Sequence, residues 1–210
     1  MTWATLIQRL RAFRRDEDGA TLVEFTIAII FFLTLLFAVI DFGRMAFSYV
    51  VAEKAMHMAS RIAAVRPAAC AGVPLTVAVH NSPTIPAPVF GSQCNSGGVI
   101  CAASTVSCTG NASNPTANEI WGLVSPRLPN SATISNISFT YASDVNLGFL
   151  GGPYVPVVTV ELTGLTFDFA TPVGGLANLI SGTQGPSGSI PFPPMTVSLP
   201  GEDLAQGNAG

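Results

Sequence analysis

An apolar stretch near the N-terminus constrains this chain more than any other feature. No charged side chain occurs between Phe25 and Ile40, and the stretch becomes 21 residues long when Ala20–Glu24 are included. As an α-helix, a segment of this length rises about 30 Å, which matches the hydrocarbon core of a bilayer. The sequence therefore predicts one membrane-spanning helix over residues 20–42.

The segment before this span, residues 1–19, is short and rich in arginine. It carries four arginines, at positions 9, 11, 14 and 15. Arginines that flank a span remain on the cytoplasmic side, so we expect a cytoplasmic leader and an exported C-terminal part. A cleaved secretory signal peptide is the competing interpretation. The length of the apolar run and the lack of a small-x-small motif directly after it disfavour that interpretation.

Charge is distributed unevenly along the chain. Residues 1–66 hold eight of the nine basic residues and six of the twelve acidic ones, a net charge of +2. The remaining residues hold Arg127 as their single basic side chain and six acidic ones, a net charge of −5. Without a basic patch on the exported part, binding of nucleic acid is not expected.

Residues 43–66 continue the span with helical periodicity. Apolar side chains recur three or four residues apart and predict one stripe of an amphipathic helix: Met45, Tyr49, Ala52, Met56, Ala59 and Ala63. Polar side chains, Ser60 among them, occupy much of the remaining surface, and Pro67 ends the pattern. Residues 20–66 are thus expected to form one helix, whose stripe packs either on the chain's own domain or on partner subunits.

The exported part is expected to be a small α+β domain. Residues 67–115 are rich in proline and glycine and predict a loop region that bears the cysteines. Within residues 116–200 the pattern predicts a short helix over 117–128 and strands over 132–141, 155–169 and 195–199. We therefore expect a long transmembrane and amphipathic helix, then a small antiparallel sheet with one short helix, and a disordered tail over 201–210.

The four cysteines all follow the span, at Cys70, Cys94, Cys101 and Cys108. In an oxidising compartment they predict two disulfides, and three pairings are possible. Proximity in the sequence favours Cys101–Cys108 together with Cys70–Cys94. Zinc binding is the rival interpretation, but no CxxC pair occurs and His80 is the only imidazole nearby.

No enzymatic motif is present in the sequence. The patterns GxSxG and HExxH are missing, and His57 and His80 are the only histidines. The glycine-rich stretches do not lead from a strand into a helix with a lysine, as a phosphate-binding loop requires. We therefore expect no catalytic residue, no metal site, no cofactor and no small-molecule substrate.

One acidic side chain lies inside the beginning of the predicted span. A carboxylate in this position is costly, so Glu24 either marks the membrane interface or has a function. Cleavage of the bond between Gly19 and Ala20 would create an α-amine one helical turn from Glu24. The two opposite charges, paired within one chain or between chains, would then offset the cost of removing each from water.

These features together resemble the type IV prepilin family, in which a basic leader ends at a glycine and a glutamate follows in the apolar helix. Ala20 after the glycine, and the Val-Glu-Phe sequence that ends at Phe25, resemble the Flp/Tad branch. The hydrophobic run into Asp41-Phe42-Gly43-Arg44 and the alanine-rich residues 55–64 are similar to TadE-like minor pseudopilins. Residues 166–172, an alternating stretch that ends in Thr-Pro, also look TadE-like.

The resemblance implies a structural and assembly role in a tight-adherence pilus, and in surface adherence. It implies that an aspartic-type membrane prepilin peptidase cuts between Gly19 and Ala20, and that Glu24 and Phe25 direct assembly. It further implies a bacterial inner-membrane protein with a periplasmic domain, whose partners are other Tad pilins or pseudopilins and an inner-membrane assembly platform. The alternative function is an uncleaved, single-pass envelope protein with a binding or adhesin module.

Overall fold

The computed structural model describes residues 18–80, 88–96, 98, 100–171, 174–175, 189–202 and 204. Most of the predicted leader therefore lies outside the described residues. The chain divides into two compact units. The helix unit consists of residues 1–44 and 169–188, and the sheet unit consists of residues 45–168 and 189–210.

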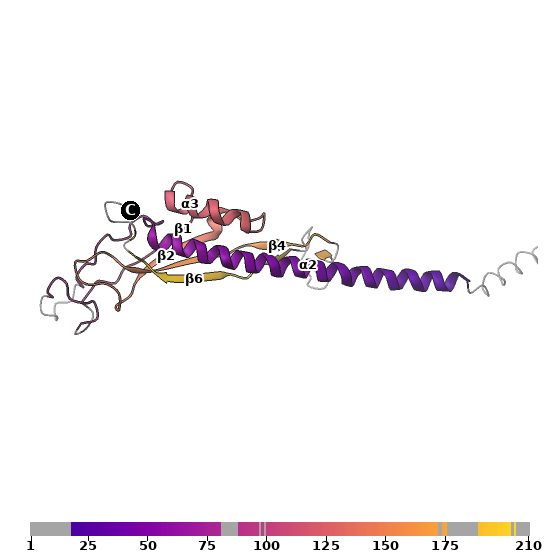
Figure 1. Ribbon diagram of the computed structural model, residues 1–210, viewed down its shortest axis with the longest axis horizontal. Helices are drawn as coiled ribbons and strands as arrows, with labels where there is room; N and C mark the ends of the chain where they lie inside the picture. Colours follow the sequence, from indigo (N-terminus) through magenta and orange to yellow (C-terminus); the bar gives the residue numbers. More distant parts are fainter. Residues whose placement is uncertain are drawn as a thin grey trace, which may run out of the picture. The chain divides into compact units, whose positions relative to one another are not determined.

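One helix, α2, runs through Asp18–Val65 and has 48 residues (Figure 1). This confirms the prediction of a single long helix that contains the apolar stretch. The helix ends where the sequence predicts, because Pro67 has no N–H group to continue the hydrogen-bond ladder. The last helical-type bond joins the Arg66 amide to the Ile62 carbonyl at 2.9 Å.

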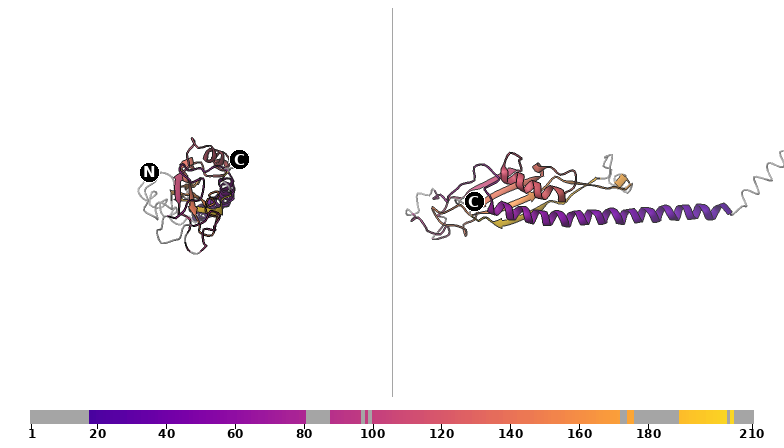
Figure 2. Two further views of the ribbon diagram at one scale, coloured as in Figure 1. Left: turned by 90° about the vertical axis from the view of Figure 1, so that its left-hand side faces the viewer. Right: turned by 45° about the horizontal axis from the view of Figure 1, so that its top comes forward.

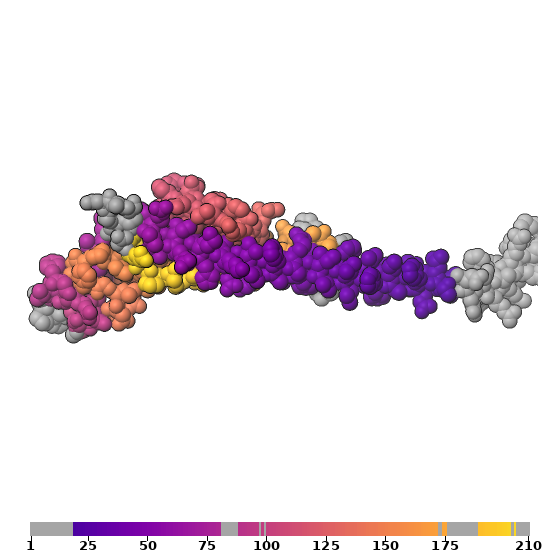
Figure 3. All heavy atoms as spheres, viewed as in Figure 1, coloured from indigo at the N-terminus to yellow at the C-terminus, as the bar shows by residue number. Residues whose placement is uncertain are grey.

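The part of α2 in the helix unit presents apolar side chains on all sides. Leu22, Phe31 and Leu35 are each exposed by about two thirds or more, and Figure 3 shows much of this surface bare on the face it draws. The hydroxyl groups of Thr26 and Thr34 donate to the carbonyls of Leu22 and Ile30, so they need no water. By length and composition α2 can cross a membrane, and none of its most apolar 18-residue stretch is buried. The structure thus contains a candidate membrane anchor near the N-terminus.

The part of α2 in the sheet unit is amphipathic. Of the predicted apolar stripe, Ala52, Met56, Ala59 and Ala63 are completely buried. Tyr49 is 37% exposed, and its ring lies 6.0 Å from that of Phe192. Ser60 was expected on the polar side but is fully buried. Its hydroxyl donates to the His57 carbonyl at 3.0 Å, which makes a small polar side chain tolerable in the packed face.

The sheet unit contains a four-stranded antiparallel sheet with the order β1-β2-β3-β6. Its strands are β1 (Thr105–Thr109), β2 (Ile137–Ser143), β3 (Pro156–Leu162) and β6 (Met195–Pro200). A two-stranded antiparallel sheet pairs β4 (Thr166–Asp168) with β5 (Ser189–Pro191). The predicted fold, a long apolar helix followed by a small antiparallel sheet and a short helix, is confirmed.

The core of the sheet unit lies on one face of the four-stranded sheet. Side chains of β2 and β3 alternate, and every second one is buried: Ile137, Phe139, Tyr141, Val158, Val160 and Leu162. The strands run alongside the second part of α2 in Figures 1 and 2. The short helix α3 (Pro115–Val124) adds Ile120 and Val124 to the core. Asn114 caps this helix by accepting a hydrogen bond from the Ala117 amide at 3.0 Å.

Three of the predicted elements have different boundaries in the structure. The strand expected over 132–141 begins only at Ile137, because a 3₁₀ turn, η2 (Ile134–Asn136), precedes it and is capped by Thr133. The strand expected over 155–169 is divided into β3 and β4, with Gly164 between them at a positive φ of 71°. The helix expected over 117–128 changes at Ser125 into the 3₁₀ turn η1 (Ser125–Arg127), since Pro126 cannot donate to the α-helical ladder.

Two further regions differ from the sequence prediction. The expected loop over residues 67–115 contains the strand β1, which is short and lies among turn-forming residues. The expected disordered tail begins with residues that make specific contacts. The amide of Gly201 donates to the Pro156 carbonyl at 2.7 Å, the amide of Glu202 donates to the Ala64 carbonyl at 2.9 Å, and Leu204 is 2% exposed. Residues 205–210 lie outside the described part of the chain.

The structure contains two disulfides, but the favoured pairing was wrong. The bonds are Cys70–Cys108 and Cys94–Cys101, with Cα–Cα distances of 5.6 and 5.0 Å. Strand pairing is the reason, because it places Cys108 opposite Phe139 on β2. The hydroxyl of Tyr141 on the same strand accepts a hydrogen bond from the Ala69 amide at 2.9 Å, which brings the neighbouring Cys70 to β1.

The two disulfides are expected to contribute unequally to stability. Cys70–Cys108 spans 38 residues and Cys94–Cys101 spans 7. Loop-closure entropy predicts about 4 kcal/mol for the longer loop and about 2 kcal/mol for the shorter one. We therefore expect the Cys70→Ser/Cys108→Ser variant to lose more free energy of unfolding than the Cys94→Ser/Cys101→Ser variant. Thermal unfolding of the detergent-solubilised chain measures both losses. The reverse order would contradict the loop-closure explanation of their contributions.

Candidate functional site: two carboxylates of the apolar helix

The predicted processing and assembly residues all lie in the first turns of α2. Gly19, Ala20 and Glu24 belong to one continuous helix, so positions 20 and 24 are one turn apart on the same face. A Cβ atom built on Gly19 would meet no atom within 4 Å. Gly19 is thus not required by packing among the described residues, and a substitution there would not distort the fold.

Glu24 and Phe25 are both exposed on the surface of α2. Phe25 is 65% exposed, and the neighbouring Leu22 and Val23 are 69% and 58% exposed. Among the described residues, no cation lies within ion-pair distance of the Glu24 carboxylate. An exposed acid surrounded by exposed apolar side chains has no favourable environment in lipid, so it is available for a partner charge.

A second carboxylate of α2, Asp41, is completely buried within the helix unit. Its Oδ1 atom accepts hydrogen bonds from the Ala170 amide at 3.3 Å and from the Arg44 guanidinium at 3.0 Å. Its Oδ2 atom accepts a bond from the Thr171 amide at 3.1 Å and another from the Thr171 hydroxyl. We call Asp41, Arg44, Ala170 and Thr171 the Asp41 clamp.

The clamp holds a chain segment that is distant in the sequence against α2. Ala170 and Thr171 follow Asp41 by 129 and 130 residues. Next to them, the rings of Phe42 and Phe169 meet edge to face at 6.0 Å, an arrangement favoured by the aromatic quadrupole. Hydrogen bonds to a charged acceptor are each worth about 1.5–3 kcal/mol, so the clamp fixes residues 169–171 firmly to this turn of the helix.

Sequence reasoning singled out both sides of the clamp but missed the contact between them. Residues 41–44 and 166–172 were each noted as similar to TadE-like proteins, and the structure brings Asp41 and Thr171 into hydrogen-bond contact. The signal that could have revealed the contact is the position of Asp41. An acid at the end of an apolar span requires partners, and amide and hydroxyl donors from a turn can supply them.

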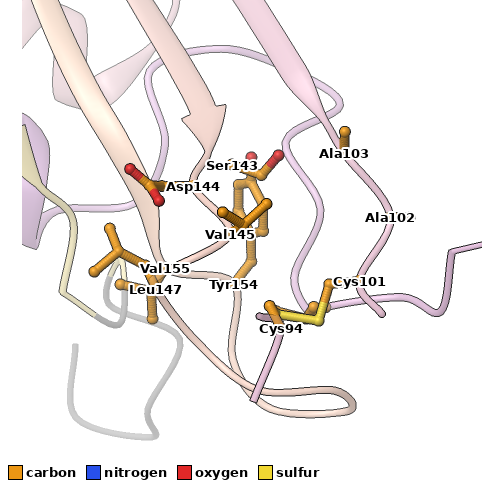
Figure 4. Close-up of a pocket in the computed structure, with 11 residues that line it drawn as sticks. Cys94, Cys101, Ala102, Ala103, Ser143, Asp144, Val145, Leu147, Tyr154 and Val155 are labelled. Carbon is orange, nitrogen blue, oxygen red and sulfur yellow. A yellow bond between two sulfur atoms is a disulfide. The ribbon is translucent and has the colours of Figure 1, made fainter. Parts of the chain in front are cut away.

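A small hollow near the Cys94–Cys101 disulfide does not form a second chemical site. It has a volume of about 80 Å³ and is lined mostly by apolar side chains (Figure 4). Its polar groups bond to the protein itself. The Tyr154 hydroxyl donates to the Ser104 carbonyl at 3.1 Å, and Asp144 accepts from the Asn146 amide at 2.8 Å. Burial raises the pKa of Tyr154, so this phenol stays protonated and is not a ready base.

Groups suited to metal binding are not gathered anywhere in the described part of the chain. No three His, Cys, Asp or Glu side chains there lie together in a way that could hold an ion. All four cysteines are consumed by disulfides, which removes the ligands that the zinc interpretation required.

Comparison with known families gives a match over most of α2. Residues 19–61 match the family model described as TadE-like protein. The match is consistent with a TadE-like protein of a Tad pilus. It includes Gly19, Glu24, Asp41 and Arg44, and it ends before the strands of the sheet unit. No match was found among curated proteins or among solved structures.

The TadE-like family is a structural family of pilus proteins. The matched segment covers the exposed apolar part of α2 and most of its buried amphipathic part. The segment of the clamp that contains Ala170 and Thr171 lies outside the match. The match thus includes the carboxylate of the clamp and its Arg44 donor, while the Ala170 and Thr171 donors come from the remainder of the chain.

The clamp can be tested through hydrogen exchange of its amides. Replacing Asp41 with alanine removes the acceptor of two backbone N–H groups, so the amides of Ala170 and Thr171 should lose protection by roughly 10- to 150-fold, the equivalent of about 1.5–3 kcal/mol. Hydrogen exchange with mass spectrometry on the solubilised full chain measures this loss. Asp168→Ala, at an exposed position in β4, serves as the matched control. Equal protection in both variants would show that the Asp41 bonds do not hold the segment.

Proposed function

We propose that this protein is a minor pseudopilin of a tight-adherence pilus, with a structural and assembly role in pilus biogenesis and surface adherence. The match of residues 19–61 to the TadE-like model is the observation that carries the proposal. That segment combines an exposed apolar helix with a glycine and a glutamate at its beginning. These are the parts that a processed, membrane-stored subunit requires.

In this proposal a prepilin peptidase cuts between Gly19 and Ala20 and removes the leader. The support is the spacing on α2, where the new α-amine of Ala20 would lie one turn from Glu24. A lone carboxylate near the middle of a span costs about 2.5–3.5 kcal/mol, and less near the edge. An amine from the same chain or from a neighbouring subunit offsets this cost, so assembly and charge pairing favour each other.

The proposed location is the bacterial inner membrane, with a cytoplasmic N-terminus and a periplasmic sheet unit. Four arginines before the span support this orientation. Two disulfides in the sheet unit support an oxidising compartment, since such bonds are rare in the cytosol. The partners are then the lipid bilayer, the peptidase, other Tad pilins or pseudopilins, and the inner-membrane assembly platform.

The chain offers a matched pair of glycines for a test of processing. Gly19 and Gly43 both lie in α2, and an added Cβ atom would meet nothing within 4 Å at either position. Gly19→Val should block removal of the leader, because a branched side chain next to the scissile bond hinders the peptidase. Gly43→Val should be processed normally. Electrophoretic mobility of the membrane-extracted protein reports both, and normal processing of Gly19→Val would contradict the cleavage site.

The role of Glu24 has a separate test. Glu24→Ala removes a charge from the span, so insertion into the membrane should persist while the yield of surface pili falls to background. Thr34→Ala is the control within the same span. Its hydroxyl bonds only the carbonyl one turn earlier among the described contacts, so pili should form normally. Membrane fractionation and electron microscopy measure the two outcomes.

Normal piliation in Glu24→Ala would show that Glu24 only marks the membrane interface and has no role in assembly. Together with a retained leader, it would favour the alternative function of an uncleaved, single-pass envelope protein with a binding or adhesin module.

A further inference from the structure

We propose that the chain touches the membrane surface at a second place, residues 169–171, which the Asp41 clamp holds at the C-terminal end of the span. The partner is the lipid interface, where headgroups meet acyl chains. The inference rests on the membrane span itself and not on cleavage after Gly19 or on pilus assembly.

The first step is the depth of Asp41 along the helix. With Ala20 at one side of the hydrocarbon core, a rise of about 1.5 Å per residue brings the helix to the other side near residue 40. Asp41 is the first charged residue after the uncharged run from Phe25, and the Arg44 guanidinium follows one turn later. Charged groups avoid the centre of a bilayer, so this turn of α2 belongs at the boundary between acyl chains and headgroups.

The second step concerns the depth of residues 170 and 171, which are distant from Asp41 in the sequence. The amides of Ala170 and Thr171 lie 3.3 and 3.1 Å from the two carboxylate oxygens of Asp41. Because both amides are hydrogen-bonded to the Asp41 side chain, they lie within about one side-chain length of the α2 backbone. Residues 170 and 171 must therefore lie at nearly the same depth as Asp41, wherever the membrane places that turn.

The third step concerns the surface that this turn presents. Phe42 is 53% exposed although its ring contacts Phe169, and Ala170 is also exposed. Exposed apolar side chains gain free energy when they leave water for the acyl-chain boundary. The carboxylate, in contrast, is completely buried and is satisfied by its four donors. The turn thus exposes apolar groups and buries its carboxylate, while the Arg44 side chain is 50% exposed. Exposed apolar groups next to an exposed cation suit the boundary between acyl chains and headgroups.

The experiment measures depth with single tryptophans in the full-length chain, reconstituted in phosphatidylcholine nanodiscs. Trp3→Phe and Trp121→Phe remove the native fluorophores. Phe42→Trp then reports the helix, Ala170→Trp reports the clamped segment, and Phe149→Trp, at a 46% exposed position of the sheet unit, is the matched control. Lipids brominated either near the headgroup or near the chain end serve as quenchers.

The inference predicts an equal loss of emission for Ala170→Trp and Phe42→Trp, larger with bromine near the headgroup than with bromine near the chain end. Phe149→Trp gives the reference loss of emission for an exposed position of the sheet unit. Addition of Asp41→Ala should abolish quenching of Ala170→Trp and leave that of Phe42→Trp unchanged. Quenching of Ala170→Trp at the level of Phe149→Trp would overturn the lipid contact. Quenching that survives Asp41→Ala undiminished would overturn the role of the clamp.

Discussion

A single continuous helix must satisfy two different environments, and this constraint underlies the other features of the chain. In the helix unit α2 exposes apolar side chains all around, whereas in the sheet unit it buries a stripe of small residues from Ala52 to Ala63. The first arrangement suits lipid, and the second suits a packed protein core. Asp41 lies near the change between them, and its carboxylate is buried but satisfied because backbone and side-chain donors enclose it.

The two carboxylates of α2 both lie at or near the apolar part of the helix, where a carboxylate without partners is unfavourable. Asp41 is satisfied by groups of its own chain, so it can stabilise the folded chain by itself. Glu24 has no cation within reach among the described residues. In the proposed function, an α-amine released by proteolysis supplies the missing charge. One acid would then serve the fold of the subunit, and the other would serve its assembly.

Local patterns predicted the parts of the fold that depend on local physics. The apolar run that ends at Ile40 needs only composition and length to be identified, and the alternation around Val158 and Val160 identifies β3. Long-range contacts were not accessible in this way. Cys108 is opposite Phe139 only after β1 and β2 pair, so pairing the cysteines by sequence proximity led to the wrong disulfides. The contact between Asp41 and Thr171 joins two stretches that each resemble TadE-like proteins, but a single sequence does not reveal that they are in contact.

Removal of the leader is the central claim, and the sequence of the mature N-terminus tests it most directly. N-terminal sequencing of the protein extracted from membranes of piliated cells should begin with Ala20, which would place a free amine beside the Glu24 side chain. A mature chain that still begins at Met1, or one that begins at a residue other than Ala20, would contradict the proposed maturation.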